Sequence, residues 1–277
     1  MKHLMQDLFS RYHWSIVITY GLTFLENIFE LLYPFIIGIT IDGLFQENYH
    51  SLITLAILWL IHTITEIGRN IYDTYTFTQI YNHLAIEIVL GQVQQGIPTS
   101  QIVARSALSR EFVNFFEQDI PRIITALFGL VGALVMLTFY DLQIAFYCLL
   151  LLLPIVPINI TYARKSLLLN HHLNNQLESE VDILAVCQPE KVEKHYTALA
   201  NYQIKLSNNT AINWGIMEIF IIILFITILI RTVSLSSKQP GDIYAIISYA
   251  WNYRQSLDII PTLVQQLSRL QDISDRL

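Results

Sequence analysis

The sequence predicts an all-α integral membrane protein with six transmembrane helices. Hydrophobic residues make up 53% of the 277 positions and charged residues only 14%, whereas a soluble domain carries about 25% charged residues. The apolar residues run in long blocks instead of a 3.6-residue stripe, which indicates that lipid surrounds them. A net charge of −6 offers no basic surface for nucleic acid, and the 2 cysteines indicate neither a disulfide scaffold nor a metal site.

Six apolar segments are long enough to cross a bilayer. The third, fourth and fifth are almost purely apolar, whereas the first, second and sixth also contain charged residues. Hydropathy alone therefore supports the middle three most directly. In chain order the expected spans are residues 14–41, 51–71, 123–139, 142–162, 214–230 and 243–263.

The connections between these spans differ greatly in length and charge. Short loops join the spans on one side, and two polar segments, 72–122 and 163–213, join them on the other. The side with the long segments and both termini holds 13 basic residues and the short-loop side holds 2, so the positive-inside rule places both termini in the cytoplasm. A central proline and helical apolar spacing predict that each long segment is a cytoplasmic helical hairpin, reaching roughly 30 Å beyond the bilayer.

Two acidic residues and an amide lie on one face of the first span. Glu26 and Glu30 are four residues apart, with Asn27 beside them, and Glu26 is about 18 Å from Trp14 along a helix, close to the bilayer centre. Ionised carboxylates there are costly, so each must be protonated, paired or facing water. Because like charges cannot pair with each other, we interpret these residues as the lining of a cavity that binds substrate or protons.

The other spans contain charged residues at helical spacing. His62 and Glu66 lie four apart on the second span, where cavity lining and a static pair are equally good interpretations. Glu218 lies near the inner end of the fifth span, and Arg254 with Asp258 on the sixth has the spacing of a static ion pair. The glutamates of the first span together with His62 and Glu66 offer zinc or manganese ligand types. Their spacing is not diagnostic, and we expect no metal or other cofactor.

Several motifs, in their order along the chain, are similar to those of one membrane family. Residues 31–38 (LLYPFIIG) are followed by Ile41 and an acidic Asp42, and residues 94–105 (QQGIPTSQIVAR) precede the third span. Residues 241–249 (GDIYAIISY) and 270–277 (LQDISDRL) open and close the last part of the chain. With six spans, short outer loops and two long hairpins, this pattern resembles the transmembrane domain of ABC exporters.

The resemblance implies a homodimer of twelve spans, in which the fourth and fifth spans cross to the partner. It also implies that a short coupling helix at each hairpin tip docks on an ATPase domain. The matching stretches are about 92–104 and 186–196. The candidate coupling residues within and beside them are Gln101, Arg105, Lys191, Lys194, His195 and Tyr196.

No ATP-binding motif follows these spans. None of the 10 glycines precedes a lysine, so no G-x-x-x-x-G-K-[ST] phosphate-binding loop is present, and no ABC signature occurs. We therefore expect residues 1–277 to form a single transmembrane domain that does not itself hydrolyse ATP. The acidic lining favours a cationic cargo, such as a basic peptide, a metal complex or a polyamine. The resemblance suggests a bacterial inner membrane as the location.

Three functions remain open at this point. The first is the membrane subunit of a transporter that is energised by a separately encoded ATPase. The second is an ATPase-free, proton-coupled transporter with the same fold, in which membrane-embedded glutamates carry protons. The third is a scaffold or regulator that does not transport, against which uncompensated acids in mid-membrane argue.

Overall fold

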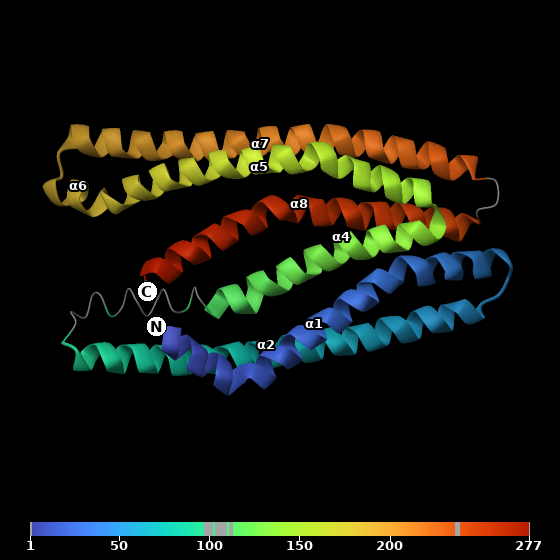
Figure 1. Cartoon of the computed structure of the whole chain (residues 1–277), viewed down its shortest axis with the longest axis horizontal. Coiled ribbons are helices and arrows are strands. Elements are labelled where there is room, and N and C mark those ends of the chain that lie inside the picture. Colours follow the sequence, from blue (N-terminus) through green and yellow to red (C-terminus); the bar gives the residue numbers. More distant parts are fainter. Residues whose placement is uncertain (1, 97–101, 103–109, 111–112, 236–238, 277) are drawn as a thin grey trace.

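The computed structural model describes residues 2–96, 102, 110, 113–235 and 239–276, and within these ranges the chain is helical with short turns. Figure 1 shows the long helices running side by side along one axis. This confirms the predicted all-α class. The elements are α1 (Lys2–Phe45), α2 (His50–Gln94), the π-helical turn η1 (Phe115–Asp119), α4 (Ile120–Tyr140), α5 (Leu142–Glu178), α6 (Glu180–Val186), α7 (Pro189–Ser234) and α8 (Pro240–Arg276).

Five helical stretches within the described residues are long and apolar enough to cross a membrane. They contain the first five expected spans, and they run over Arg11–Phe45, His50–Gln94, Phe115–Tyr140, Leu142–Leu177 and Pro189–Ser234. The sixth expected span falls in α8, which is not among the five. Polar residues such as Ser248 and Asn252, together with Arg254 and Asp258, interrupt its apolar residues. A sixth crossing therefore stays a prediction.

The two ends of the molecule have different connections. One end, which we call the short-turn end, carries the α1–α2 turn (residues 46–49), the single residue Asp141 between α4 and α5, and the α7–α8 connection. The opposite end, the long-hairpin end, carries α6 and the last turn of α2 at residues 90–94, and both chain termini lie toward it (Figure 1). The described parts of the two long polar segments thus lie toward the same end.

The helices pack in pairs around a core formed chiefly by α4, α5, α7 and α8. The principal pairs are α1 with α2, α4 with α8 and α5 with α7, while α8 also packs along α1. Two fully buried tyrosines of α8 anchor this core through their hydroxyls: Tyr249 donates to the Leu31 carbonyl at 2.8 Å and Tyr253 to the Cys148 carbonyl at 2.7 Å. These bonds satisfy polar groups that burial would otherwise leave without water.

A close backbone approach joins α1 to α8 at the short-turn end. A Cβ atom on Gly38 would lie 2.7 Å from the Gly241 carbonyl oxygen, so neither position has room for a side chain. Next to this contact, Asp42 Oδ1 accepts a hydrogen bond from the Gly241 N–H at 2.8 Å. The carboxylate therefore satisfies one of the free N–H groups at the start of α8 and favourably meets its dipole.

The second long polar segment folds as two long helices with a short helix between them. α5 continues without a break beyond the expected fourth span, α6 follows, and α7 begins at Pro189 after a turn in which Cys187 adopts a positive φ of 49°. Buried amides join α5 to α7: Asn209 donates to Ser166 Oγ at 2.9 Å. The first polar segment extends α2 to Gln94, and most of its return lies outside the described residues.

Candidate functional site

An ion-pair network joins Glu26 of α1 to α2. Arg69 pairs with the Glu26 carboxylate and also donates to Asp73 Oδ2 at 3.2 Å. The three side chains are only 18%, 13% and 9% exposed. Glu26 is therefore neutralised by a cation 43 residues away in the sequence, and the expectation that it is uncompensated is corrected.

Glu30 lies one turn further along α1 and, unlike Glu26, has no cationic partner among the described residues. Among the residues that the structure describes, it has neither an ion pair nor a hydrogen bond, and its side chain is exposed to the space between α1, α4 and α8. His62 forms a hydrogen bond with Tyr33 of α1, in which the His62 Nδ1 atom lies 2.8 Å from the Tyr33 hydroxyl. Glu66 is exposed on α2. Within the described ranges, the four residues considered as metal ligands form no group that could hold a metal ion.

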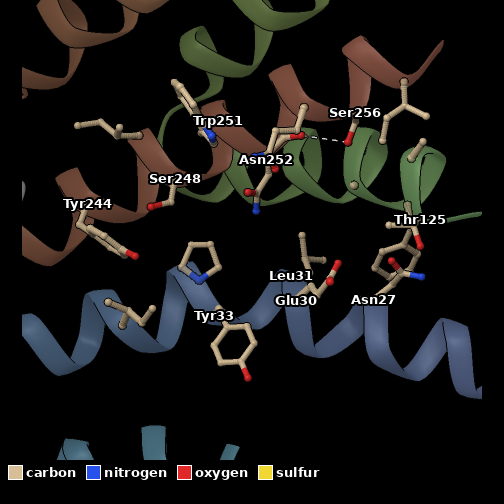
Figure 2. Close-up of a pocket in the computed structure, with 18 residues that line it drawn as sticks. Asn27, Glu30, Leu31, Tyr33, Thr125, Tyr244, Ser248, Trp251, Asn252 and Ser256 are labelled. Atoms are coloured by element: carbon tan, nitrogen blue, oxygen red, sulfur yellow. Dashed lines mark hydrogen bonds between the residues drawn. The ribbon is translucent and has the colours of Figure 1, made fainter. Parts of the chain in front are cut away.

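Two adjoining cavities lie between α1, α4 and α8. The first has a volume of about 550 Å³, and Glu30 shares it with polar residues of α4 and α8. Figure 2 shows the Glu30 carboxylate and the Asn252 amide directed toward each other across this space, with Ser248 and Tyr244 further along α8. The second cavity, of about 570 Å³, continues toward the long-hairpin end and is lined by Glu26 and Arg69. Residues that line both are Asn27, Glu30, Thr125 and Ile259.

A second charged network joins α7 to α8 beside these cavities. Arg254 donates to Glu218 Oε2 at 2.9 Å, and its other terminal nitrogen lies 3.8 Å from Asp258 Oδ2. Its guanidinium also lies 4.9 Å from the centre of the Trp251 ring, in a cation–π contact. The pair expected within α8 is present in a network of three charges, and its stronger partner is Glu218 on the neighbouring helix.

The candidate coupling residues do not all face outward at the long-hairpin end. Lys191, Lys194 and Tyr196 are exposed on the first turns of α7, and the Tyr196 hydroxyl donates to Glu180 Oε1 at 2.9 Å. His195 is only 1% exposed, and its Nδ1 lies 2.8 Å from Gln176 Nε2 of α5. His195 therefore packs inside the tip and cannot present a docking surface. Gln101 and Arg105 lie outside the described residues.

Several cavity residues were not singled out by the sequence interpretation. Tyr244, Ser248, Asn252 and Ser256 of α8 recur every four residues along one face, and that polar stripe within an apolar segment is a readable signal. Thr125 of α4 is an isolated hydroxyl in an apolar helix and carries no comparable signal. Its place in the cavity depends on how α4 packs against α1 and α8.

The fold and the cavities define a polytopic α-helical membrane protein with a space between its helices that is lined by both apolar and polar side chains. A family model described as "ABC transporter transmembrane region" matches residues 4–238. Because this match covers most of the 277 residues, the chain belongs to the family of ABC transporter transmembrane regions. No curated protein matches the sequence significantly.

Membership of this family agrees with the resemblance seen in the sequence motifs. It identifies an integral membrane protein and indicates the membrane component of a transporter, since this family forms the transmembrane part of ABC transporters. Components of this kind commonly act with an ATP-binding partner.

Proposed function

We propose that this chain is the membrane subunit of a transporter that moves a small cationic solute or peptide by alternating access. In this proposal an ATP-binding domain outside these 277 residues supplies the energy, and the chain itself has no ATPase activity. The working unit is a homodimer in a bacterial inner membrane, with both termini and the long-hairpin end in the cytoplasm. The observation that supports the proposal most strongly is the cavity that contains Glu30, in a chain that belongs to the ABC transporter transmembrane family.

The cavity has the properties of a cargo site. Its volume of about 550 Å³ lies within the 300–1,000 Å³ usual for small-molecule sites. It is lined mainly by apolar side chains, with an acid, amides and hydroxyls on α1, α4 and α8. A cavity of this kind holds an organic solute by its apolar body and orients it by a few polar contacts.

The tip of the second hairpin supports the proposed energy coupling. α6 is a short helix at the long-hairpin end (Figure 1), and it carries Leu184 and Val186, which are 43% and 57% exposed. Exposed Lys191 and Lys194 lie beside it on α7. Apolar groups rimmed by polar ones are typical of a docking surface. We therefore propose α6 with the start of α7 as the docking site of the ATP-binding domain.

Transport by proteoliposomes that contain the protein and its ATP-binding domain tests this function. We expect ATP-dependent, vanadate-sensitive movement of a cationic solute. Val186→Glu should weaken docking at least about tenfold, because a buried charge at an interface core is unfavourable. Ile204→Glu is the matched control, since Ile204 is 56% exposed, close to the 57% of Val186, but lies on α7 away from the tip. Transport that is equally impaired by both variants, or by neither, would contradict the docking site.

A proton-coupled transporter is the second candidate, and Glu30 favours it. A carboxylate without a cation partner in the described structure can bind and release a proton as the cavity opens to either side. This candidate predicts uptake driven by an imposed pH gradient without ATP, and its loss in Glu30→Gln.

The argument against a scaffold now depends on one acidic residue of the first span instead of two. Glu26 pairs with Arg69, so its desolvation cost is partly offset and it no longer argues against a purely structural role. The argument now depends on Glu30 and on the cavity that it lines. Unchanged transport in the Glu26→Gln, Glu30→Gln double variant would favour a role other than cargo or proton binding for both residues.

A further inference from the structure

Among the described residues, each charged side chain that lines the two cavities has an oppositely charged neighbour within ion-pair distance, with one exception. In the second cavity, Glu26 pairs with Arg69, Glu117 with Arg110 at 3.9 Å, and Asp258 with Arg254 at 3.8 Å. Arg122, which also lines it, lies 3.6 Å from Asp119. Only Glu30, among the charged lining residues that the structure describes, lacks an oppositely charged neighbour within ion-pair distance.

Glu30 is also the single charged residue that lines the first cavity in the described structure. The rest of that lining consists of apolar groups, aromatic rings and neutral hydrogen-bonding groups. Asn252 of α8 lies across the cavity from Glu30, and Ser248 and Tyr244 follow along α8 toward the short-turn end (Figure 2). A ligand with one positive charge would therefore neutralise the single carboxylate in this mainly apolar space.

We propose that the first cavity binds an organic monocation, with Glu30 as its counter-ion and the α8 amides and hydroxyls opposite as neutral hydrogen-bond partners. This inference rests on the proposed transport function, because it takes the cavity as the cargo site. It narrows the cargo to a compound with one cationic nitrogen and an apolar body. Glu26, four residues earlier, pairs with Arg69 and lines the second cavity and not the first, so it is not part of the proposed site.

The same lining disfavours the other cationic cargoes. A divalent metal ion needs several oxygen or nitrogen ligands, and the first cavity offers one carboxylate among its described residues. A polyamine or a basic peptide would bring a second positive charge into a space without a second free acid, and burying an unpaired charge is costly. Aromatic rings such as Tyr244 stabilise a nearby cation without supplying a counter-charge.

Binding to the protein in lipid nanodiscs, without ATP, tests this inference. The probe is dansylcadaverine, which carries one ammonium group, and its dansyl emission rises in an apolar site. The N-acetylated compound is the neutral analogue, and a dansylated triamine with two ammonium groups is the doubly charged one. Glu30→Gln removes the charge with little change in shape, and Glu87→Gln is the matched control on an exposed part of α2 outside both cavities.

We expect the singly charged probe to bind about 10- to 100-fold more tightly than the neutral analogue, as a charge-assisted hydrogen bond provides. Glu30→Gln should abolish that preference while leaving the neutral analogue's affinity unchanged, which also shows that the cavity is folded. The inference would be overturned if the wild type bound the singly charged probe and its neutral analogue equally, or bound neither detectably. It would also be overturned if Glu30→Gln retained the preference for the singly charged probe. Tenfold tighter binding of the doubly charged probe would also overturn it. None of these outcomes depends on ATP-driven transport, which the proteoliposome assay tests separately.

Discussion

Replacing Arg69 by glutamine removes the cation that Glu26 and Asp73 share. The three side chains are each less than one-fifth exposed, so the two acids would be left in a poorly hydrated space with no opposite charge. Breaking a buried ion pair from one side costs about 3–5 kcal/mol. Because some water reaches these side chains, we expect a cost at the lower end of this range, about 3 kcal/mol, for Arg69→Gln.

The free energy of unfolding is measured by reversible SDS titration in mixed micelles, followed by the loss of helical circular dichroism. Arg122→Gln is the matched control, since Arg122 is 61% exposed and 3.6 Å from Asp119; an exposed pair contributes less than about 1 kcal/mol. The double variant Glu26→Gln, Arg69→Gln removes both charges and should recover at least about 1 kcal/mol relative to Arg69→Gln. A loss for Arg69→Gln no larger than for Arg122→Gln, or no recovery in the double variant, would refute the ion-pair network.

Two further predictions concern the short-turn end. Gly241→Ala should destabilise the protein by about 1–3 kcal/mol, because a new Cβ would meet the Gly38 carbonyl. The control variant Gly215→Ala should be neutral or stabilising, because its Cβ would meet nothing within 4 Å. Thermal unfolding of both variants checks this prediction. Burial raises the pKa of Asp141, but hydrogen bonds from Arg231 and from the backbone N–H groups of Ile144 and Gln143 outweigh it and hold the pKa below its ordinary value. The stabilisation from Asp141 is thus complete above the unfolded-state pKa of about 3.9 and is lost as the pH falls through the lower folded-state pKa. Unfolding curves from pH 5 to pH 2.5 should show a smaller pH dependence in Asp141→Asn, and an unchanged dependence would contradict this role.

The helices and their membrane-spanning character were predictable because long apolar blocks carry that information locally. α2 and α7 are continuous over 45 and 46 residues, and helical spacing in the polar segments indicates that each helix continues beyond its apolar part. α8 is harder to assign, because its cavity-facing stripe of Tyr244, Ser248 and Asn252 lowers its hydropathy. The property that makes it a site helix thus weakens the signal of a membrane span.

The partners of the charged residues could not be predicted in the same way. The sequence allows a comparison of residues three or four apart on one helix, and this spacing predicted the pair of Arg254 with Asp258. The shorter contacts in this structure join different helices: Arg69 reaches Glu26 over 43 positions, and Arg254 reaches Glu218 over 36. Which of two adjacent glutamates is compensated therefore depends on how α2 packs on α1, and nothing in the local pattern distinguishes Glu26 from Glu30.

Purification from the native membrane in mild detergent tests most directly whether this chain works as the membrane part of an ATP-driven transporter. The particle should contain an ATP-binding domain in equal number to this chain, on the same polypeptide or on a partner, and hydrolyse ATP. A cross-linker attached to the exposed Cys187, next to α6, should capture that domain. A particle that contains no ATP-binding polypeptide, and that moves its solute on a proton gradient alone, would contradict the proposal.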